Sequence, residues 1–280
     1  MCRLYGLLAT HPTQPACALR RAQNTQIEQG QTDGQRPVAG WGVGVRSRSS
    51  IRCWRQVQPA EKSAQVRAEA LSMRGTAVLA ATHALPTRRS AVSDVQPFRD
   101  GPAMLVCDGD LPAFADLRSD VLSALTPARR QAIRGDTAGE HLFQLLRERA
   151  RQLPTRSMAG SLRAVLHNLT RWSETTGRSG PMALSMLWIQ NGRMAGVCCN
   201  RSLYVLNRSA PLRCSVCGHP HARLTPQADY RAVVVASRPL TDEDWQRVPN
   251  RSLLAVDRQA RLTVSSLDRP ARSWLRAGSG

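Results

Sequence analysis

The chain has 280 residues, of which 42% are hydrophobic and 21% are charged, and this composition excludes a largely disordered protein. No apolar run of about 18 residues occurs and the N-terminus lacks a signal-peptide pattern, so we expect a cytoplasmic protein with no membrane partner. The formal net charge is +19, but Lys62 is the only lysine among 39 basic residues, the arginines are scattered, and three Tyr and three Phe offer no base-stacking platform, which argues against a nucleic-acid partner.

The first half of the chain alternates between short apolar runs and amphipathic segments. Apolar or period-2 runs predict strands at residues 4–9, 40–45, 76–82 and 103–106. Apolar residues at helical spacing predict helices at residues 15–28, 60–74, 111–125, 140–153 and 157–175. The polar, glycine-containing segment 29–38 is interpreted as a loop.

The second half consists mainly of predicted strands joined by short turns. These strands cover residues 182–189, 193–198, 202–206, 231–236, 252–257 and 261–264. Asn191-Gly192 between the first two is a strong hairpin signal, and residues 241–244 predict one helical turn opened by Thr241. Strands at both ends with helices between them indicate stacked sheets covered by helices.

Cys2 is the first residue of interest for chemistry. Removal of Met1 would give Cys2 a free α-amino group, whose ordinary pKa of about 7.7–8.0 suits it to act as a base beside the thiol. Such an arrangement is typical of N-terminal nucleophiles. The alternative is a small buried cysteine at the beginning of a strand, and position alone does not decide between the two.

Several motifs along the chain together resemble those of one enzyme family. They are "MCRLYG", "AGWGVG", "QPF" followed by "CDGDL", "GDTAGEHLF" and "VVVASRPLTDEDWQRVPNRSLLAVD". In order and spacing the chain resembles the class II glutamine amidotransferases, which are N-terminal nucleophile hydrolases, and in particular the free-standing γ-glutamyl amide hydrolases. The resemblance implies an α+β fold, a four-layer αββα sandwich over residues 1–267, followed by a basic C-terminal tail at residues 268–280.

The resemblance also assigns roles to individual residues. Cys2 matches the catalytic nucleophile, and Arg3 matches the residue that usually follows it. Trp41 and Gly42 match a substrate-binding turn, although the acidic residue of that turn is Ala39 here. Gly109 matches a residue of the oxyanion hole, so the resemblance implies that part of the catalytic machinery is kept.

Three positions that face the substrate in the family are changed in this chain. His83 stands where an arginine binds the substrate α-carboxylate, Asp108 where an asparagine donates to the oxyanion, and Ala138 where an acidic residue holds the α-amino group. An ionised Asp108 can only accept hydrogen bonds, and losing one oxyanion donor typically lowers the rate by about 10²–10³. The substrate site is therefore interpreted as partly degenerate.

Two functional hypotheses follow from this mixture of kept and changed residues. In the first, the Cys2 thiol hydrolyses the amide of glutamine or another small γ-glutamyl amide, either as a free-standing enzyme or as a subunit that supplies ammonia to a synthase partner. In the second, the chain is a catalytically inactive pseudoenzyme that serves as a binding or regulatory module. Measured turnover with a Cys2→Ala control separates them.

A separate cysteine and histidine cluster is Cys214-Ser-Val-Cys217-Gly-His219-Pro-His221. A CxxC pair followed by Gly resembles a zinc knuckle, and His219 and His221 would complete four ligands. The histidine spacing is tighter than the usual three to five intervening residues, and there is no second CxxC pair. Zinc is therefore the one candidate cofactor, and the alternative is an ordinary surface loop between two strands.

Overall fold

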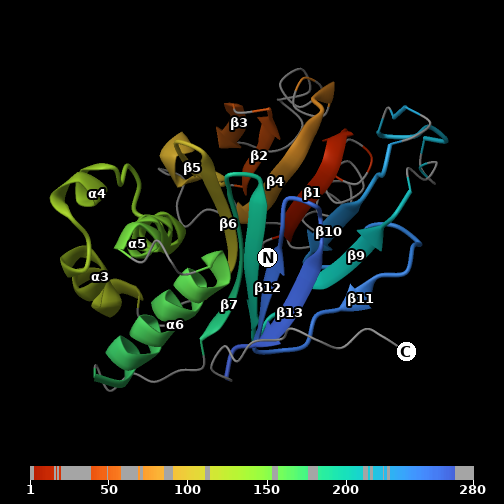
Figure 1. Cartoon of the computed structure of the whole chain (residues 1–280). Helices are drawn as coiled ribbons and strands as arrows, with labels where there is room; N and C mark the ends of the chain where they lie inside the picture. The colour runs from red at the N-terminus through yellow and green to blue at the C-terminus, as the bar shows by residue number, and fades with distance from the viewer. Residues whose placement is uncertain are drawn as a thin grey trace, which may run out of the picture.

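The computed structural model contains two antiparallel sheets that pack face to face, with helices beside one of them (Figure 1). It describes residues 3–15, 17, 19, 39–48, 50–57, 69, 72–84, 91–110, 114–152, 157–175, 182–210, 214, 217–222, 224–225 and 228–268. The helices predicted at residues 15–28 and 60–74 lie mostly outside this part of the chain, as do Cys2 and residues 269–280 of the predicted tail.

The first sheet has seven strands in the order β11-β9-β10-β1-β4-β2-β3, so the first strand of the chain lies at its centre. Their bounds are β1 (Arg3–Thr13), β2 (Ala39–Ser47), β3 (Ser50–Val57), β4 (Gly75–Ala84), β9 (Tyr204–Arg208), β10 (Ala232–Ala236) and β11 (Gln246–Arg247). Strand β1 is paired with β10 on one side and β4 on the other, both antiparallel.

The second sheet has six strands in the order β13-β12-β8-β7-β6-β5. Their bounds are β5 (Phe98–Asp100), β6 (Ala103–Asp110), β7 (Ala183–Gln190), β8 (Arg193–Cys199), β12 (Ser252–Val256) and β13 (Leu262–Ser266). The β7–β8 hairpin turns at Asn191 and Gly192, whose φ values of 51° and 72° are those of a type I′ turn, as their sequence predicts.

The described helices cover the outer face of the six-stranded sheet (Figure 1). They are α3 (Phe114–Ser123), α4 (Pro127–Gln131), α5 (Ala138–Gln152) and α6 (Met158–Thr175), with the short 3-10 helix η2 (Val92–Asp94) before β5. Within the described residues, no helix has both the length and the apolar character needed to cross a membrane.

Side-chain alternation along the strands produces three apolar clusters, as expected for sheets that are buried on both faces. On β1, Leu4 and Leu8 point into the cluster between the sheets, whereas Tyr5 and Leu7 point to the other face. A third cluster joins the six-stranded sheet to the helices. The outer cluster of the seven-stranded sheet includes Leu19, which is buried.

A buried carboxylate, that of Glu148, attaches α5 to the residue in front of α4. Glu148 of α5 has a fully buried side chain, whose oxygens accept hydrogen bonds from Thr126 Oγ1 (2.9 Å), Arg151 Nη2 (2.8 Å) and Gln152 Nε2 (3.0 Å). Burial alone would raise the pKa of Glu148, but these donors outweigh burial and hold the pKa below its ordinary value.

Most of the predicted strands and the three predicted helices that lie in the described part are present, with shifted bounds. The strand predicted at 4–9 runs from Arg3 to Thr13 because its polar end, from Thr10, still forms hydrogen bonds with the segment around Arg231. Strand β3 was not predicted. It lies at the sheet edge, where its half-buried side chains leave no clear apolar pattern.

The helical turn predicted at residues 241–244 is wrong, because this segment is an irregular bend. Its early carboxylate does not cap a helix. Glu243 instead forms an ion pair with Arg208, with 2.8 Å between Arg208 Nε and Glu243 Oε1, and also accepts from Thr241 Oγ1 at 2.7 Å. A long-range partner thus overrides the local capping preference.

Replacing Leu187 by Ala tests the packing between the two sheets. Leu187 is fully buried, and its methyl groups lie against Gly6 and Gly196, where an added Cβ would come within 2.8 Å of them. We expect Leu187→Ala to lower the free energy of unfolding by about 2–5 kcal/mol in urea titrations. The control Val264→Ala, at a side chain that is 40% exposed, should stay within about 0.5 kcal/mol. Equal losses would contradict this account of the core.

Candidate functional site

The candidate site lies at the beginning of β1. Arg3 is paired with Thr82 of β4, and Thr82 is paired with Trp41 of β2. On the other side of β1, the Leu4 amide donates to Ser237 Oγ at 3.2 Å, and the Ser237 amide donates to the Leu4 carbonyl at 3.1 Å. Segments far apart in the sequence therefore meet around the first residues of the strand.

A small pocket of about 20 Å³ opens at this place, roughly the space for one water molecule. Its polar lining comes from motifs that the sequence singled out: Arg3, Trp41, Thr82, Ser237 and Arg238. Burial lowers the pKa of Arg3, and burial together with the charge of Arg3 lowers the pKa of Arg238. The pocket thus carries positive charge beside the position that follows Cys2, while Cys2 itself lies outside the described residues and its role stays a prediction.

Trp41 and Gly42 lie within strand β2, which is paired with β3 and β4, and not in an open turn. Trp41 is buried and belongs to the outer cluster of the seven-stranded sheet. Gly42 is paired with Ala81, and a Cβ atom at Gly42 would lie 2.0 Å from the Gln96 carbonyl oxygen. Only glycine allows the β4–β5 connection to approach β2 this closely.

His83 lies on β4 directly after Thr82 and is largely enclosed. Its Nε2 lies 3.3 Å from the Asp94 carbonyl oxygen, which can only accept, so Nε2 carries the proton. Its Nδ1 is buried without a hydrogen-bond partner, and its ring fills the space left by Gly40. Burial lowers the pKa of His83, which disfavours the charged imidazole that a carboxylate would need as a partner.

Asp108 and Gly109 lie at the end of β6, where Asp108 is half-buried and Gly109 is exposed. Gly109 has φ +146°, and a Cβ atom there would lie 1.9 Å from the Ala183 carbonyl oxygen, so only glycine fits. The preceding residue, Cys107, is held by Gln96, which receives a hydrogen bond from the Cys107 amide at 2.6 Å and donates to its carbonyl at 2.9 Å.

Ala138 is the first residue of α5, and this helix start packs on β6. A Cβ atom at Gly139 would lie 2.6 Å from Cys107 Sγ, so the backbone of the helix meets the residue that precedes Asp108. Glu140 is buried and accepts from the Gly135 amide at 2.7 Å, which holds the loop in front of the helix. Ala138 itself offers no group that could hold an amine.

Asp94 connects two of the changed positions. Its carbonyl oxygen faces His83, while its carboxylate accepts from the Asp136 amide at 3.2 Å, two residues before Ala138. The same carboxylate accepts from the Ala91 amide at 2.8 Å. The end of β4 and the start of α5 are therefore tied together through one short connection.

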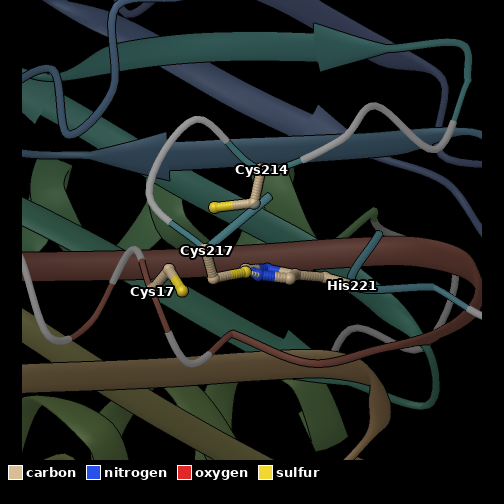
Figure 2. Close-up of side chains that lie close together, drawn as sticks. All are labelled: Cys17, Cys214, Cys217 and His221. Atoms are coloured by element: carbon tan, nitrogen blue, oxygen red, sulfur yellow. Dashed lines mark hydrogen bonds between the residues drawn. The ribbon is translucent and has the colours of Figure 1, made fainter. Parts of the chain in front are cut away.

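A second cluster consists of residues that follow β1 and β9, and it shares no residue with this pocket. Figure 2 shows Cys17, Cys214, Cys217 and His221, with the three thiols and the imidazole brought together from two segments of the chain. One ligand atom from each lies within 4.8 Å of all the others, and Cys217 Sγ is 3.3 Å from His221 Nε2. Burial and the neighbouring thiols of Cys217 and Cys214 raise the pKa of Cys17 to about 12.

The predicted ligand set differs from this group at one position. Cys214, Cys217 and His221 are brought together, but His219 is not part of the group and its place is taken by Cys17. His219 contributes only its carbonyl oxygen, which accepts from the Cys214 amide at 3.1 Å. Cys17 was missed because it lies about 200 residues away in sequence, and only strand pairing brings it near.

The two facing antiparallel sheets, with helices on the six-stranded one, have the sandwich architecture of the N-terminal nucleophile hydrolases. The particular family follows from comparison with known proteins. The family described as glutamine amidotransferases class-II matches residues 1–277, and the chain belongs to that family. A search of curated proteins finds no match.

Solved structures with the same fold share little sequence with this chain. A glutamine aminotransferase class-II domain protein from Silicibacter pomeroyi is 19% identical with a TM-score of 0.62, over 95% of this chain and 99% of that one. A predicted glutamine amidotransferase from Pseudomonas aeruginosa is 19% identical with a TM-score of 0.57, over 92% and 98%. Glutamine phosphoribosylpyrophosphate amidotransferase from B. subtilis is 14% identical with a TM-score of 0.62, over 96% of this chain and 50% of that one.

Replacing Gln96 by Leu tests how the end of β6 is held. The Gln96 side chain is buried and forms hydrogen bonds with both backbone groups of Cys107, so Gln96→Leu removes two hydrogen bonds from a buried backbone segment. We expect about 1–3 kcal/mol less unfolding free energy and faster hydrogen exchange of the Cys107 amide. The exposed control Gln131→Leu should change neither. Unchanged exchange at Cys107 would contradict the role given to Gln96.

Proposed function

We propose that this chain hydrolyses the amide of a small γ-glutamyl compound through the thiol of Cys2, and that glutamine itself is a poor substrate. The observation that carries the proposal is the convergence of the family's motifs on one pocket at the beginning of β1. Arg3, Trp41 and Ser237 come from three separated motifs and line the same small space. In the family, this is the place at which the nucleophile acts.

The nucleophile and its base both belong to the N-terminal residue. With Met1 removed, the α-amino group of Cys2 takes the thiol proton as sulfur attacks the amide carbonyl. The tetrahedral intermediate collapses, the C–N bond breaks, and the amine leaves with that proton. Water then hydrolyses the thioester, which returns the thiol and gives the free γ-carboxylate.

The changed residues support a substrate other than glutamine. His83, whose pKa is lowered by burial, does not replace a guanidinium that binds the α-carboxylate, and the side chain of Ala138 cannot hold an α-amino group. Positive charge lies instead at Arg3 and Arg238, which line the pocket together with Thr82. We infer that the substrate carries a carboxylate that binds near Arg3 and Arg238. We also infer that it lacks a free α-ammonium group, which would need an acidic partner.

The observation that favours the pseudoenzyme is Asp108. A carboxylate repels a developing oxyanion unless it is protonated, so the half-buried Asp108 opposes the reaction at its transition state. Under this alternative the pocket binds an anionic ligand without turnover. A role as a subunit that supplies ammonia to a synthase partner is possible only if the chain is an active enzyme, because a pseudoenzyme releases no ammonia.

Turnover measurements with full-length protein decide between the two. We expect intact-mass spectrometry to show that Met1 is absent, and ammonia or amine release from a panel of γ-glutamyl amides to exceed that from glutamine. Cys2→Ala should abolish release, while Cys53→Ala, at a cysteine on β3, should not. Quantitative retention of Met1, or release that persists in Cys2→Ala, would refute the enzyme hypothesis.

The triple change His83→Arg, Asp108→Asn and Ala138→Asp restores the three contacts of the family. We expect glutamine hydrolysis to rise by about 10²-fold or more in kcat, mainly through Asp108→Asn, because that substitution returns an oxyanion donor. The other two should act on KM and be non-additive, since all three groups share one ligand. A triple variant that binds glutamine beside Cys2 in a crystal structure yet shows no turnover would overturn this explanation.

A further inference from the structure

We propose that Cys17, Cys214, Cys217 and His221 form a structural zinc site that joins the segment after β1 to the connection between β9 and β10. The two segments leave the same sheet, and their ligand atoms already lie within 4.8 Å of one another. This inference does not depend on the activity of the chain, because none of the four residues lines the pocket at the beginning of β1.

The geometry is close to that which zinc requires. Zn–S bonds of about 2.3 Å in a tetrahedron place the sulfur atoms about 3.8 Å apart, so the present separations need to close by about 1 Å or less. Three thiolates and one imidazole are a common closed set for structural zinc. With four protein ligands no position remains for water or substrate, so the site is structural and not catalytic.

The backbone around the cluster is fixed by contacts that do not involve the ligand atoms. Thr13 and Ala222 form an isolated bridge, and the Gln14 amide donates to the His221 carbonyl at 3.0 Å. Arg74 Nη1 donates to the same carbonyl at 2.8 Å. His221 is therefore held beside the segment that leads to Cys17, and the two halves of the site are positioned by the fold.

The CxxC turn has the local structure that lets two cysteines share one ion. The Gly218 amide donates to the Cys214 carbonyl at 2.8 Å, which closes the turn, and Gly218 has φ +71°, which favours glycine. Three thiolates around Zn²⁺ leave a net negative charge, and the guanidinium of Arg74 lies next to His221 and offsets it. Soft sulfur ligands favour zinc over magnesium or calcium.

Cys17 is the one proposed ligand that lies outside the local CxxC motif, so its replacement tests the site most directly. Full-length protein, purified under reducing conditions without chelators, should contain about one zinc per chain by elemental analysis. Cys17→Ser should lose most of that zinc, although it leaves the CxxC pair and both histidines intact. His219→Ala and Cys53→Ser should keep the zinc of the wild type, because neither residue belongs to the cluster.

Replacement of zinc by Co²⁺ in the wild type provides a test that no unfolded variant can obscure. We expect the intense d–d bands of tetrahedral cobalt and thiolate-to-cobalt charge transfer that corresponds to three Co–S bonds. Reduced wild-type protein that takes up neither metal would overturn the proposal, as would Cys17→Ser with the zinc content of the wild type. A Cys214–Cys217 disulfide in natively purified protein would also overturn it.

Discussion

The position of β1 at the centre of the seven-stranded sheet is the constraint on which the rest of the structure depends. Its backbone is paired on both edges, with β4 and β10, and its side chains are buried on both faces. The strand can therefore shift neither sideways nor along its axis without moving apolar residues to the wrong face. Because Arg3 is paired with Thr82, the first described residue of the strand is held at one defined place.

The β1 constraint extends to both candidate sites. At one end of the strand, pairing brings Arg3 to the walls formed by β2, β4 and the segment after β10. At the other end, Thr13 bridges to Ala222 and places the following segment beside His221. One central strand thus holds a candidate site at each of its ends.

The sequence predicted the fold class and most strands because buried strands leave apolar runs, and Asn191-Gly192 could be identified because its turn needs two positive φ values. Strand β3 could not be predicted, since its pairing with β2, and not its own pattern, makes it a strand. The ion pair of Glu243 could not be predicted, because its partner Arg208 is distant in sequence. Cys17 has no local signal at all, so three of the four clustered ligands were predictable and the fourth was not.

The buried carboxylate of Glu148 gives the helical layer a particular response to acid. Its pKa in the folded chain lies below the ordinary value, so the stability it contributes is complete above that ordinary value and is lost as the pH falls through the lowered one. The pKa of Asp100 is also lowered. This residue of β5 forms ion pairs with Arg129 of α4 and Arg147 of α5, and so joins the strand to the helices. Acid therefore weakens the polar contacts that join the helices to one another and to β5, while the apolar cluster between the helices and the six-stranded sheet remains. The consequence is a gradual loss of stability at low pH, with the helices still held on the sheet by their apolar side chains.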